Sequence, residues 1–308
     1  MVAHESKKHH YVPRFYLQHF CGADERVRFC FVKKYAPDYQ DIQWASIKPD
    51  AVAYECNLNR DDTLGDPLLV EEHLSEIDSH SSHVISSVLQ QRRLPADTAS
   101  LNILIEYVAY HATRTPDAMK IAGVLDQWVD TEQLLPSRPY YRSGGALGVI
   151  ERAKRIIPVA KELKWSLEET LPSNQFVTSS RPVGIYVRVP DVCGPASSGE
   201  PAGWPDAEFV TLPLAPTLAL IGSRPKTGFR FPHSLRFRTA LINGMTAYYA
   251  ETIFAQNENT EYLSVDNKGP CKLAQFLTEA DAESKRNLKP VPWQSDPHSM
   301  GGKGVGYL

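Results

Sequence analysis

Apolar residues in the first half of the chain recur at the three- and four-residue steps of an amphipathic helix. One stripe joins Val70, Leu74, Ile77, Val84, Ile85 and Val88, and a second joins Leu101, Leu104, Ile105, Val108 and Ala112. This period predicts two helices that each bury one face. Asp97 is placed to cap the second helix, which we expect to end or bend near Pro116.

Three further stretches favour helix. They are residues 117–132, residues 147–163, which Pro158 would bend, and residues 240–254, where Leu241, Met245, Tyr248 and Thr252 follow helical spacing. A break at Ser143-Gly144-Gly145 separates the first two. From about residue 290 the chain carries Pro, Gly and Ser with little periodicity, and we expect a flexible tail there.

Short β-rich runs predict strands. A turn at Pro37-Asp38 separates two of them and suggests a hairpin, and an exposed loop is expected between residues 190 and 205. The runs are residues 27–32, 42–47, 176–179, 183–189, 209–212 and 218–221. We expect an α+β fold, a mainly helical single domain with a small, mostly antiparallel sheet. The domain would span residues 1–265, with residues 266–308 as a C-terminal extension.

Composition sets few limits on function. The chain has 308 residues, 42% of them hydrophobic, and a net charge of -3, which gives no global attraction to nucleic acid or anionic membrane. No apolar run approaches the roughly 20 residues of a membrane span, and we expect no membrane association. Five scattered cysteines without paired spacing favour reduced thiols, so we expect a cytoplasmic protein.

The segment from His9 to Phe20 is the most informative part of the sequence. Val12 precedes Pro13 and is pushed toward extended backbone, and Pro13 suits the first position of a short helix. His9 and His10 then lie in an extended stretch, with side chains on opposite sides. Either imidazole is a candidate general base or metal ligand. The alternative is that both histidines only fix the path of the chain through hydrogen bonds.

Two acids and an arginine add candidate chemistry to the predicted helices. Glu71 and Asp78 are seven residues apart, so they project from nearly the same helix face and suit a divalent cation or acid–base work. Solvated boundary acids are the alternative. Arg114, which shares a helix side with Tyr107 and His111, is a candidate anion clamp. A structural ion pair from Arg114 to Glu71 or Asp78 is equally consistent with the spacing.

The order of these motifs resembles a bacterial family catalogued as domain of unknown function 4238. The run His9 to Leu17 is similar to its His-His-x-Val-Pro-x-x-Tyr-Leu signature, and Arg114-Thr115-Pro116 is similar to its Arg-Thr-Pro step. Further matches are Glu71 with Asp78, Phe176 to Ser179 followed by Pro182, Thr211 to Pro216, and the helix containing Asn243. The resemblance implies matching positions without assigned roles. It also implies an acid after Ser179, where this chain has Ser180.

A stretch between Arg224 and Arg238 interleaves arginines and a lysine with phenylalanines. Such a pattern can hold a nucleic-acid strand by charge and stacking, although a strand-turn with its charges outward is the commoner structure. Nucleic acid is therefore a candidate partner.

Together these features predict a polar cleft that contains six candidate residues. We expect His9, His10, Arg14 and Arg114 as catalytic residues and Glu71 and Asp78 as ligands of a divalent metal. The expected reaction is a hydrolysis, metal-assisted or not, of a phosphate-containing or nucleic-acid substrate. The alternative is a non-catalytic binding module in which the same His, Glu and Arg residues form a structural polar network.

Overall fold

The computed structural model describes residues 8–32, 39, 41–120, 145–189, 192–196, 204–224, 234–264 and 269–287. The fold is α+β and combines helices with several small sheets, in which every pairing is antiparallel. Among the described residues, none of the helices combines the length and the apolar character needed to cross a membrane.

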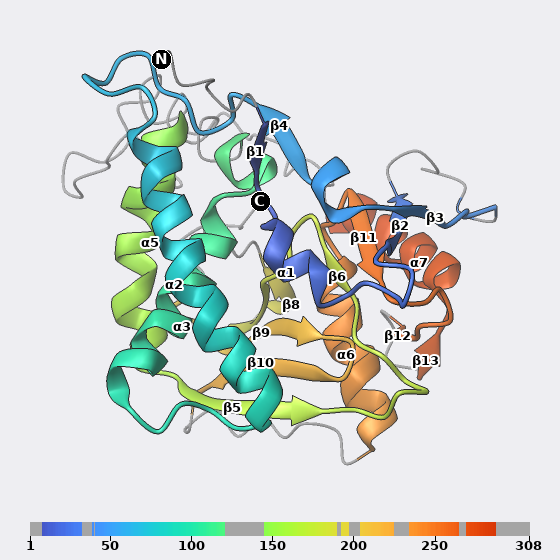
Figure 1. Ribbon diagram of the computed structural model, residues 1–308. Coiled ribbons are helices and arrows are strands. Elements are labelled where there is room, and N and C mark those ends of the chain that lie inside the picture. The colour runs from blue at the N-terminus through green and yellow to red at the C-terminus, as the bar shows by residue number, and fades with distance from the viewer. Residues whose placement is uncertain are drawn as a thin grey trace, which may run out of the picture.

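Three long helices pack side by side and form one side of the molecule (Figure 1). They are α2 (Leu69–Gln91), α3 (Thr98–Thr113) and α5 (Gly145–Lys161). The predicted apolar stripes form the buried faces of α2 and α3, and Asp97 caps α3 by accepting a hydrogen bond from the Ser100 amide at 2.7 Å. The helix expected over residues 147–163 is α5, which contains Pro158.

Two larger sheets lie on the other side of the molecule (Figure 1). The five-stranded sheet has the order β5 (Lys164–Glu169), β10 (Leu218–Ser223), β9 (Ala207–Ala215), β7 (Gly184–Val189) and β8 (Val192–Ala196). The four-stranded sheet has the order β3 (Ala45–Ile47), β2 (Val27–Phe31), β11 (Thr252–Ala255) and β6 (Thr178–Ser179). Strands from both halves of the chain therefore pair, as expected, but they form separate sheets rather than one.

Two short ribbons and four further elements, one of which is the C-terminal helix α7 (Leu273–Asn287), accompany these helices and sheets. One ribbon pairs β1 (Lys8–His10) with β4 (Tyr54–Cys56), and the other pairs β12 (Tyr262–Leu263) with β13 (Pro270–Cys271). The other elements are α1 (Arg14–Gln18), the short 3-10 helix η2 (Pro49–Ala51) and α6 (Leu235–Ala247). The strand pairing of the expected hairpin is confirmed, because β2 pairs with β3, whereas its expected turn at Pro37-Asp38 lies outside the described residues.

The prediction of one helix over residues 240–254 is wrong. The helix α6 ends at Ala247, the chain turns, and residues from Thr252 onward form β11 in the interior of the four-stranded sheet. Thr252 continues the helical spacing of the preceding apolar residues only by coincidence. The whole of β11 is buried and pairs on both of its edges, and this pairing outweighs the local helical pattern.

Other expectations fall partly or wholly outside the described residues. The helix expected over residues 117–132 is described only to residue 120, where the chain is helical. The expected loop at 190–205 contains the strand β8, and the tail expected from residue 290 lies outside. Within the expected C-terminal extension, α7 (Leu273–Asn287) buries Phe276 against Tyr262, with ring centroids 5.5 Å apart.

Candidate functional site

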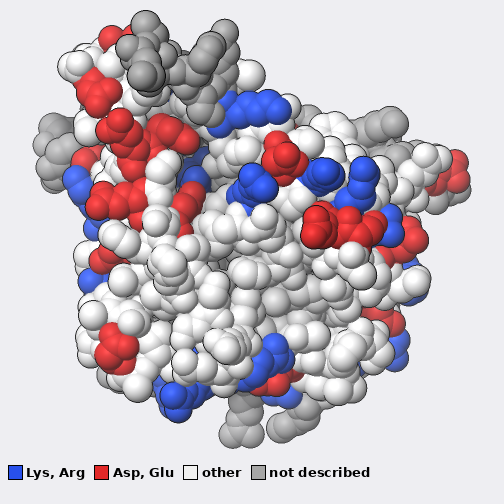
Figure 2. Space-filling view, in the orientation of Figure 1, with Lys and Arg blue, Asp and Glu red and all other residues white. Residues whose placement is uncertain are grey.

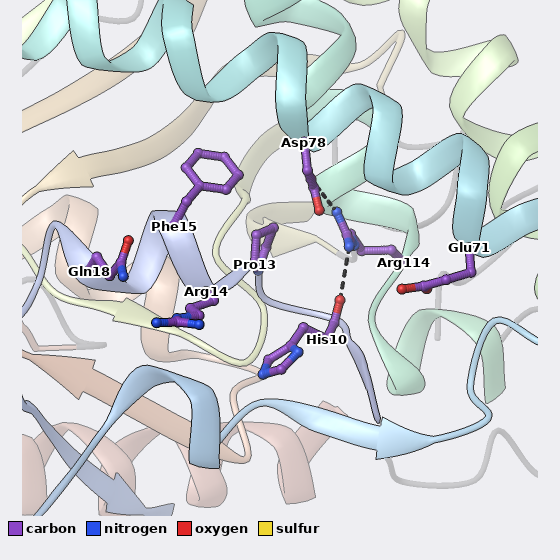
Figure 3. A pocket seen from close by; sticks show the side chains of 8 residues that line it. All are labelled: His10, Pro13, Arg14, Phe15, Gln18, Glu71, Asp78 and Arg114. Atoms are coloured by element: carbon purple, nitrogen blue, oxygen red, sulfur yellow. Dashed lines mark hydrogen bonds and ion pairs between the residues drawn. The ribbon is translucent and has the colours of Figure 1, made fainter. Parts of the chain in front are cut away.

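A pocket of about 410 Å³ lies between α2 and the N-terminal segment that carries β1 and α1 (Figure 3). Its lining consists of His10, Pro13, Arg14, Phe15, Gln18, Glu71, Asp78 and Arg114. Five of the six residues proposed from the sequence therefore line one pocket. The sixth, His9, lies behind its wall.

His9 and His10 point to opposite sides because they follow each other on the strand β1. His9 is 1% exposed, and its Nδ1 accepts a hydrogen bond from the Asn59 amide at 2.8 Å. An Nδ1 that accepts a hydrogen bond carries no proton, so the neutral ring holds its proton on Nε2. The 3.9 Å approach of the same Nδ1 to the Glu71 carboxylate is consequently not an ion pair. His9 fixes the chain, as the structural alternative predicted.

Asn59 connects His9 to the pocket, and sequence reasoning missed it. It is fully buried in the turn after β4, and its side-chain Nδ2 donates to Glu71 Oε2 at 2.7 Å. The amide therefore orients the Glu71 carboxylate while the backbone of the same residue orients His9. An asparagine in an Asp- and Asn-rich loop gives no signal of this role, because such residues are ordinary there.

Arg114 ties the acidic helix to the histidine segment. It is 3% exposed, and it donates to Asp78 Oδ1 at 2.7 Å and to the His10 carbonyl oxygen at 2.8 Å (Figure 3). Burial by itself would lower the pKa of Arg114, but the Asp78 carboxylate outweighs burial and the pKa is raised. The structural ion pair considered from the sequence is thus present, and Arg114 acts on the pocket by holding Asp78 and His10 in place.

His10 lines the pocket and has one ring nitrogen without a hydrogen-bond partner among the described residues. That nitrogen, Nε2, is buried. Burial lowers the pKa of His10 below its ordinary value of 6.5, and the positive charges of Arg114, Lys8 and Arg14 lower it further, while a hydrogen bond to the Asp50 backbone opposes them. The ring is accordingly neutral near pH 7, the form that accepts a proton or binds a metal.

The helix α1 supplies the remaining side of the pocket. Arg14 and Gln18 are exposed and one turn apart, with the ring of Phe15 beside them (Figure 3). No ion pair to Arg14 is found within the described parts of the chain, so its guanidinium can receive an anion. Tyr16 and Leu17 of α1 are buried, and the ring of Tyr16 contacts that of Phe20 in a tilted arrangement with centroids 5.5 Å apart.

A buried aromatic cluster supports the pocket from behind. His111 is fully buried between Tyr16 and Tyr107, with ring centroids 4.9 Å from each. The two ring nitrogens of His111 have no hydrogen-bond partner among the described residues. The same is true of the Tyr107 hydroxyl. Burial, together with the charge of Arg114, lowers the pKa of His111 well below 6.5. His111 is therefore a neutral core residue.

The predicted metal ligands lie in the pocket without forming a complete metal centre. Glu71 and Asp78 both line it, but each already has one oxygen bound by a protein donor, Asn59 or Arg114. Within the residues that the structure describes, no three His, Cys, Asp or Glu side chains are grouped so that they could hold a metal ion. A cation bound at these two carboxylates would need further ligands from water or substrate.

The other matched motifs lie in a separate, sealed part of the molecule, which we call the Asn243 network (Asn243, Ser179 and Ser180 with their partners). Asn243 Oδ1 accepts from the Val177 amide at 2.9 Å, and its Nδ2 donates to the carbonyl oxygens of Gln175 and Glu261. Ser180 Oγ accepts hydrogen bonds from the Glu251 and Thr252 amides at 3.0 and 3.2 Å.

Ser180 therefore has a structural role and is not among the residues that line the pocket. Its oxygen accepts two backbone N–H groups, which a carboxylate at the same position can also do. Serine in place of the acid expected from the resemblance leaves the lining of the pocket unchanged.

The basic and aromatic stretch offers little support for a nucleic-acid strand. Residues 225–233 lie outside the described residues. The arginines that are described each form an ion pair, Arg224 with Glu162, Arg236 with Glu261 and Arg238 with Glu168. Their charges are thus already compensated by acids of the same chain.

Residues 8–258 match the family described as protein of unknown function DUF4238. The chain belongs to this family. No curated protein and no solved structure matches the chain. The matched region contains the whole lining of the pocket and Ser179, Ser180 and Asn243, whereas Glu261, one partner of Asn243, follows it.

Proposed function

We propose that the pocket between α1 and α2 is the active site of a hydrolase that acts on a phosphate-containing substrate. The observation that carries the proposal is the position of His10. Its buried, unpartnered Nε2 shares a pocket with the unpaired cation of Arg14 and the carboxylates of Glu71 and Asp78. A base, an anion receptor and acceptors for a metal or hydroxyl are the groups that phosphoester hydrolysis uses.

In this proposal His10 is the general base that takes a proton from the attacking water. Its lowered pKa keeps the ring neutral near pH 7 and ready to accept that proton. Arg14 receives the phosphate oxygens and stabilises the charge that develops on them. His9, Asn59 and Arg114 are positioning residues that hold Glu71, Asp78 and His10 at the pocket wall.

A divalent metal is an optional part of the proposal, and the carboxylate of Glu71 or Asp78 would bind it. Mg²⁺ is commonly bound through one or two carboxylates plus substrate phosphate and water, so the free oxygen of Glu71 or that of Asp78 could supply one ligand. Adding EDTA and restoring Mg²⁺ or Mn²⁺ separates the metal-assisted reaction from the metal-free one.

The alternative function is a binding module without catalysis. It is favoured by the satisfied parts of the network, since His9 and Arg114 are buried and hydrogen bonded within the chain. In that case ligands would bind at Arg14 without turnover.

The test is an activity screen on the purified chain with p-nitrophenyl phosphate, bis-p-nitrophenyl phosphate and short RNA and DNA strands. For a substrate that is turned over, His10→Gln should lower kcat by about a hundredfold or more, the usual contribution of a general base. The rate of the unaltered protein should rise with pH through a pKa below 6.5 and then level off.

The matched control is His19→Gln. His19 is also partly buried with an unpartnered Nε2 and a lowered pKa, but it does not line the pocket. Its replacement should leave kcat unchanged. Activity that survives both His10→Gln and Arg14→Gln would place the reaction elsewhere and refute the proposal.

The wider setting is also proposed. We infer a cytoplasmic protein, because every cysteine whose side chain is described, Cys21, Cys30, Cys56 and Cys271, is a free thiol, and a bacterial one, because of the resemblance to a bacterial family. We further infer a mainly helical single domain over residues 1–265. One hydrophobic core joins residues of α2, α3 and α5 to residues of the five-stranded sheet, which supports a single unit.

A further inference from the structure

The pocket has two walls of opposite chemistry. Arg14 and Gln18 lie on the N-terminal segment and offer donors, whereas Glu71 and Asp78 project from α2 and offer acceptors (Figure 3). Arg114 compensates the charge of Asp78, so one uncompensated cation, Arg14, faces one carboxylate, Glu71, that is held only by an amide donor. A ligand that fits both walls needs an anionic group at one end and hydrogen-bond donors at the other.

The acceptor wall is extended rather than concentrated at one point. Glu71 keeps Oε1 and Asp78 keeps Oδ2 without a hydrogen bond to the described residues, since their other oxygens bind Asn59 and Arg114. Seven residues of α-helix separate the two side chains by about 10 Å along the axis. Acceptors spread over such a length suit several hydroxyl groups along a ligand, whereas a single ammonium group would satisfy only one of them.

The surface around the pocket disfavours a polymer of phosphates. The N-terminal half of α2 also carries the exposed Glu72 and Glu76, and Figure 2 shows acidic side chains gathered over that part of the helix, with basic ones beyond the pocket. Double-stranded DNA carries about one negative charge per 1.7 Å of axis, so a nucleic-acid strand laid across the pocket would meet these acids. A small ligand with a single phosphate avoids them.

We propose that the ligand of this pocket is a small phosphorylated polyhydroxy compound of the ribose phosphate type. Its phosphate lies at Arg14, and its hydroxyls donate to Glu71 and Asp78. The volume of about 410 Å³ is within the range of small-molecule sites, and Phe15 and Pro13 supply the apolar part of the lining. This inference rests on the pocket of the proposed function and names its substrate class.

Equilibrium binding by calorimetry or NMR titration tests the inference, with ribose 5-phosphate, inorganic phosphate, ribose and a 12-nucleotide RNA as probes. Ribose 5-phosphate should bind at least about tenfold more tightly than inorganic phosphate, the gain of one charge-assisted hydrogen bond. Arg14→Gln should weaken both phosphate-containing small probes by about tenfold or more. Glu71→Gln should weaken ribose 5-phosphate by a similar factor and leave inorganic phosphate unchanged.

Two charge-matched controls are available on the same surface. Glu72→Gln removes a carboxylate from the residue next to Glu71, and Arg28→Gln removes an exposed arginine that lies on β2 outside the pocket. Neither change should alter the affinity for ribose 5-phosphate. Equal weakening by Glu71→Gln and Glu72→Gln would show a diffuse charge effect and overturn the inference.

The outcomes also separate this inference from the proposed hydrolysis. Binding of ribose 5-phosphate with the expected variant pattern but without turnover of any phosphoester supports the inference while the hydrolase proposal fails. Tighter binding of the RNA than of ribose 5-phosphate, or equal affinity for ribose 5-phosphate and inorganic phosphate, overturns the inference even if hydrolysis is found.

Discussion

The pocket and the Asn243 network both contain polar residues of the motifs that resemble the family's, yet these residues are hydrogen bonded to different extents. In the Asn243 network the amide of Asn243 uses its oxygen and its nitrogen in three hydrogen bonds, and Ser180 accepts two. At the pocket His10 Nε2 and Arg114 Nε are buried without partners among the described residues. The polar groups of the Asn243 network are hydrogen bonded within the chain. At the pocket, some polar groups remain without a partner in the described part of the chain and can bind a ligand.

This difference separates structural from functional polar residues within one set of motifs. A buried polar group that is fully hydrogen bonded stabilises one conformation, and its partners account for its presence. A polar atom beside an open pocket that has no partner within the chain is not explained by the fold, and it indicates a ligand. By this criterion we assign His10 and Arg14 to the proposed function, whereas the hydrogen bonds of His9, Ser180 and Asn243 account for their presence in the fold.

Arg114 is hydrogen bonded within the chain like a structural residue but also lines the pocket. Its removal should have the largest effect on the free energy of unfolding. Arg114→Leu leaves the Asp78 carboxylate and the His10 carbonyl without their donor, and we expect a loss of about 3 kcal/mol in the free energy of unfolding. Chemical denaturation measures it. The double variant Arg114→Leu with Asp78→Asn should recover part of the loss, because it removes the unpaired charge. A loss below about 1 kcal/mol would mean that the pair is not a stabilising contact.

Asn243→Leu tests the sealed region. It leaves the Val177 amide and two carbonyl groups unpaired in the interior, so we expect a loss of about 2 kcal/mol. Binding of ribose 5-phosphate at the pocket should be unchanged at a temperature where the variant is folded. A weakened affinity in the folded variant would contradict the separation of the two regions.

Substitutions of Ser180 should have a smaller effect on stability, and two of them can be compared directly. Ser180→Ala removes the acceptor of two amides and should cost about 1 kcal/mol. Ser180→Asp restores an acceptor and should be the more stable of the two variants in thermal unfolding near pH 7. Neither should change kcat. A gain of activity in Ser180→Asp would instead assign this position to the chemistry.

The smallest expected effect is a dependence of stability on pH. The pKa values of His10 and His111 are lowered on folding from 6.5, so between their folded values and 6.5 the unfolded chain binds more protons. Their contribution to stability is thus fully present above about pH 6.5 and decreases as the pH falls below it. His111→Leu should flatten this decrease without a loss at pH 7.5, since neither ring nitrogen has a partner. An unchanged slope would exclude His111 as its source.

The sequence predicted those features that depend on neighbouring residues. The stripes of α2 and α3, the Asp97 cap, the opposed side chains of His9 and His10 and the pairing of β2 with β3 all follow from local period and local chemistry. The pocket was partly predictable for the same reason, because Glu71 and Asp78 share a helix face. The sequence left two alternatives for Arg114, an anion clamp and a structural ion pair, and the structure shows the ion pair with Asp78.

Features that depend on distant partners were not predictable. The strand β11 carries a helical spacing and becomes a strand because β2 and β6 pair with its edges. Asn59 has its role because Glu71 and His9 meet it from other parts of the chain. The division between sealed and open polar groups likewise requires the exposure of each atom, which a single sequence does not contain.

Tyr16 has a consequence for how the protein acquires this pocket during synthesis. Its hydroxyl bonds to Thr178 in the four-stranded sheet and to the Pro213 carbonyl in the five-stranded sheet, across 162 and 197 residues of chain. At about 5–20 residues per second, a ribosome takes on the order of ten seconds or more to reach the second partner. The N-terminal segment that bears His10 therefore gains these two hydrogen bonds only after most of the chain has left the ribosome, and a truncated product that lacks β9 would lack the second of them.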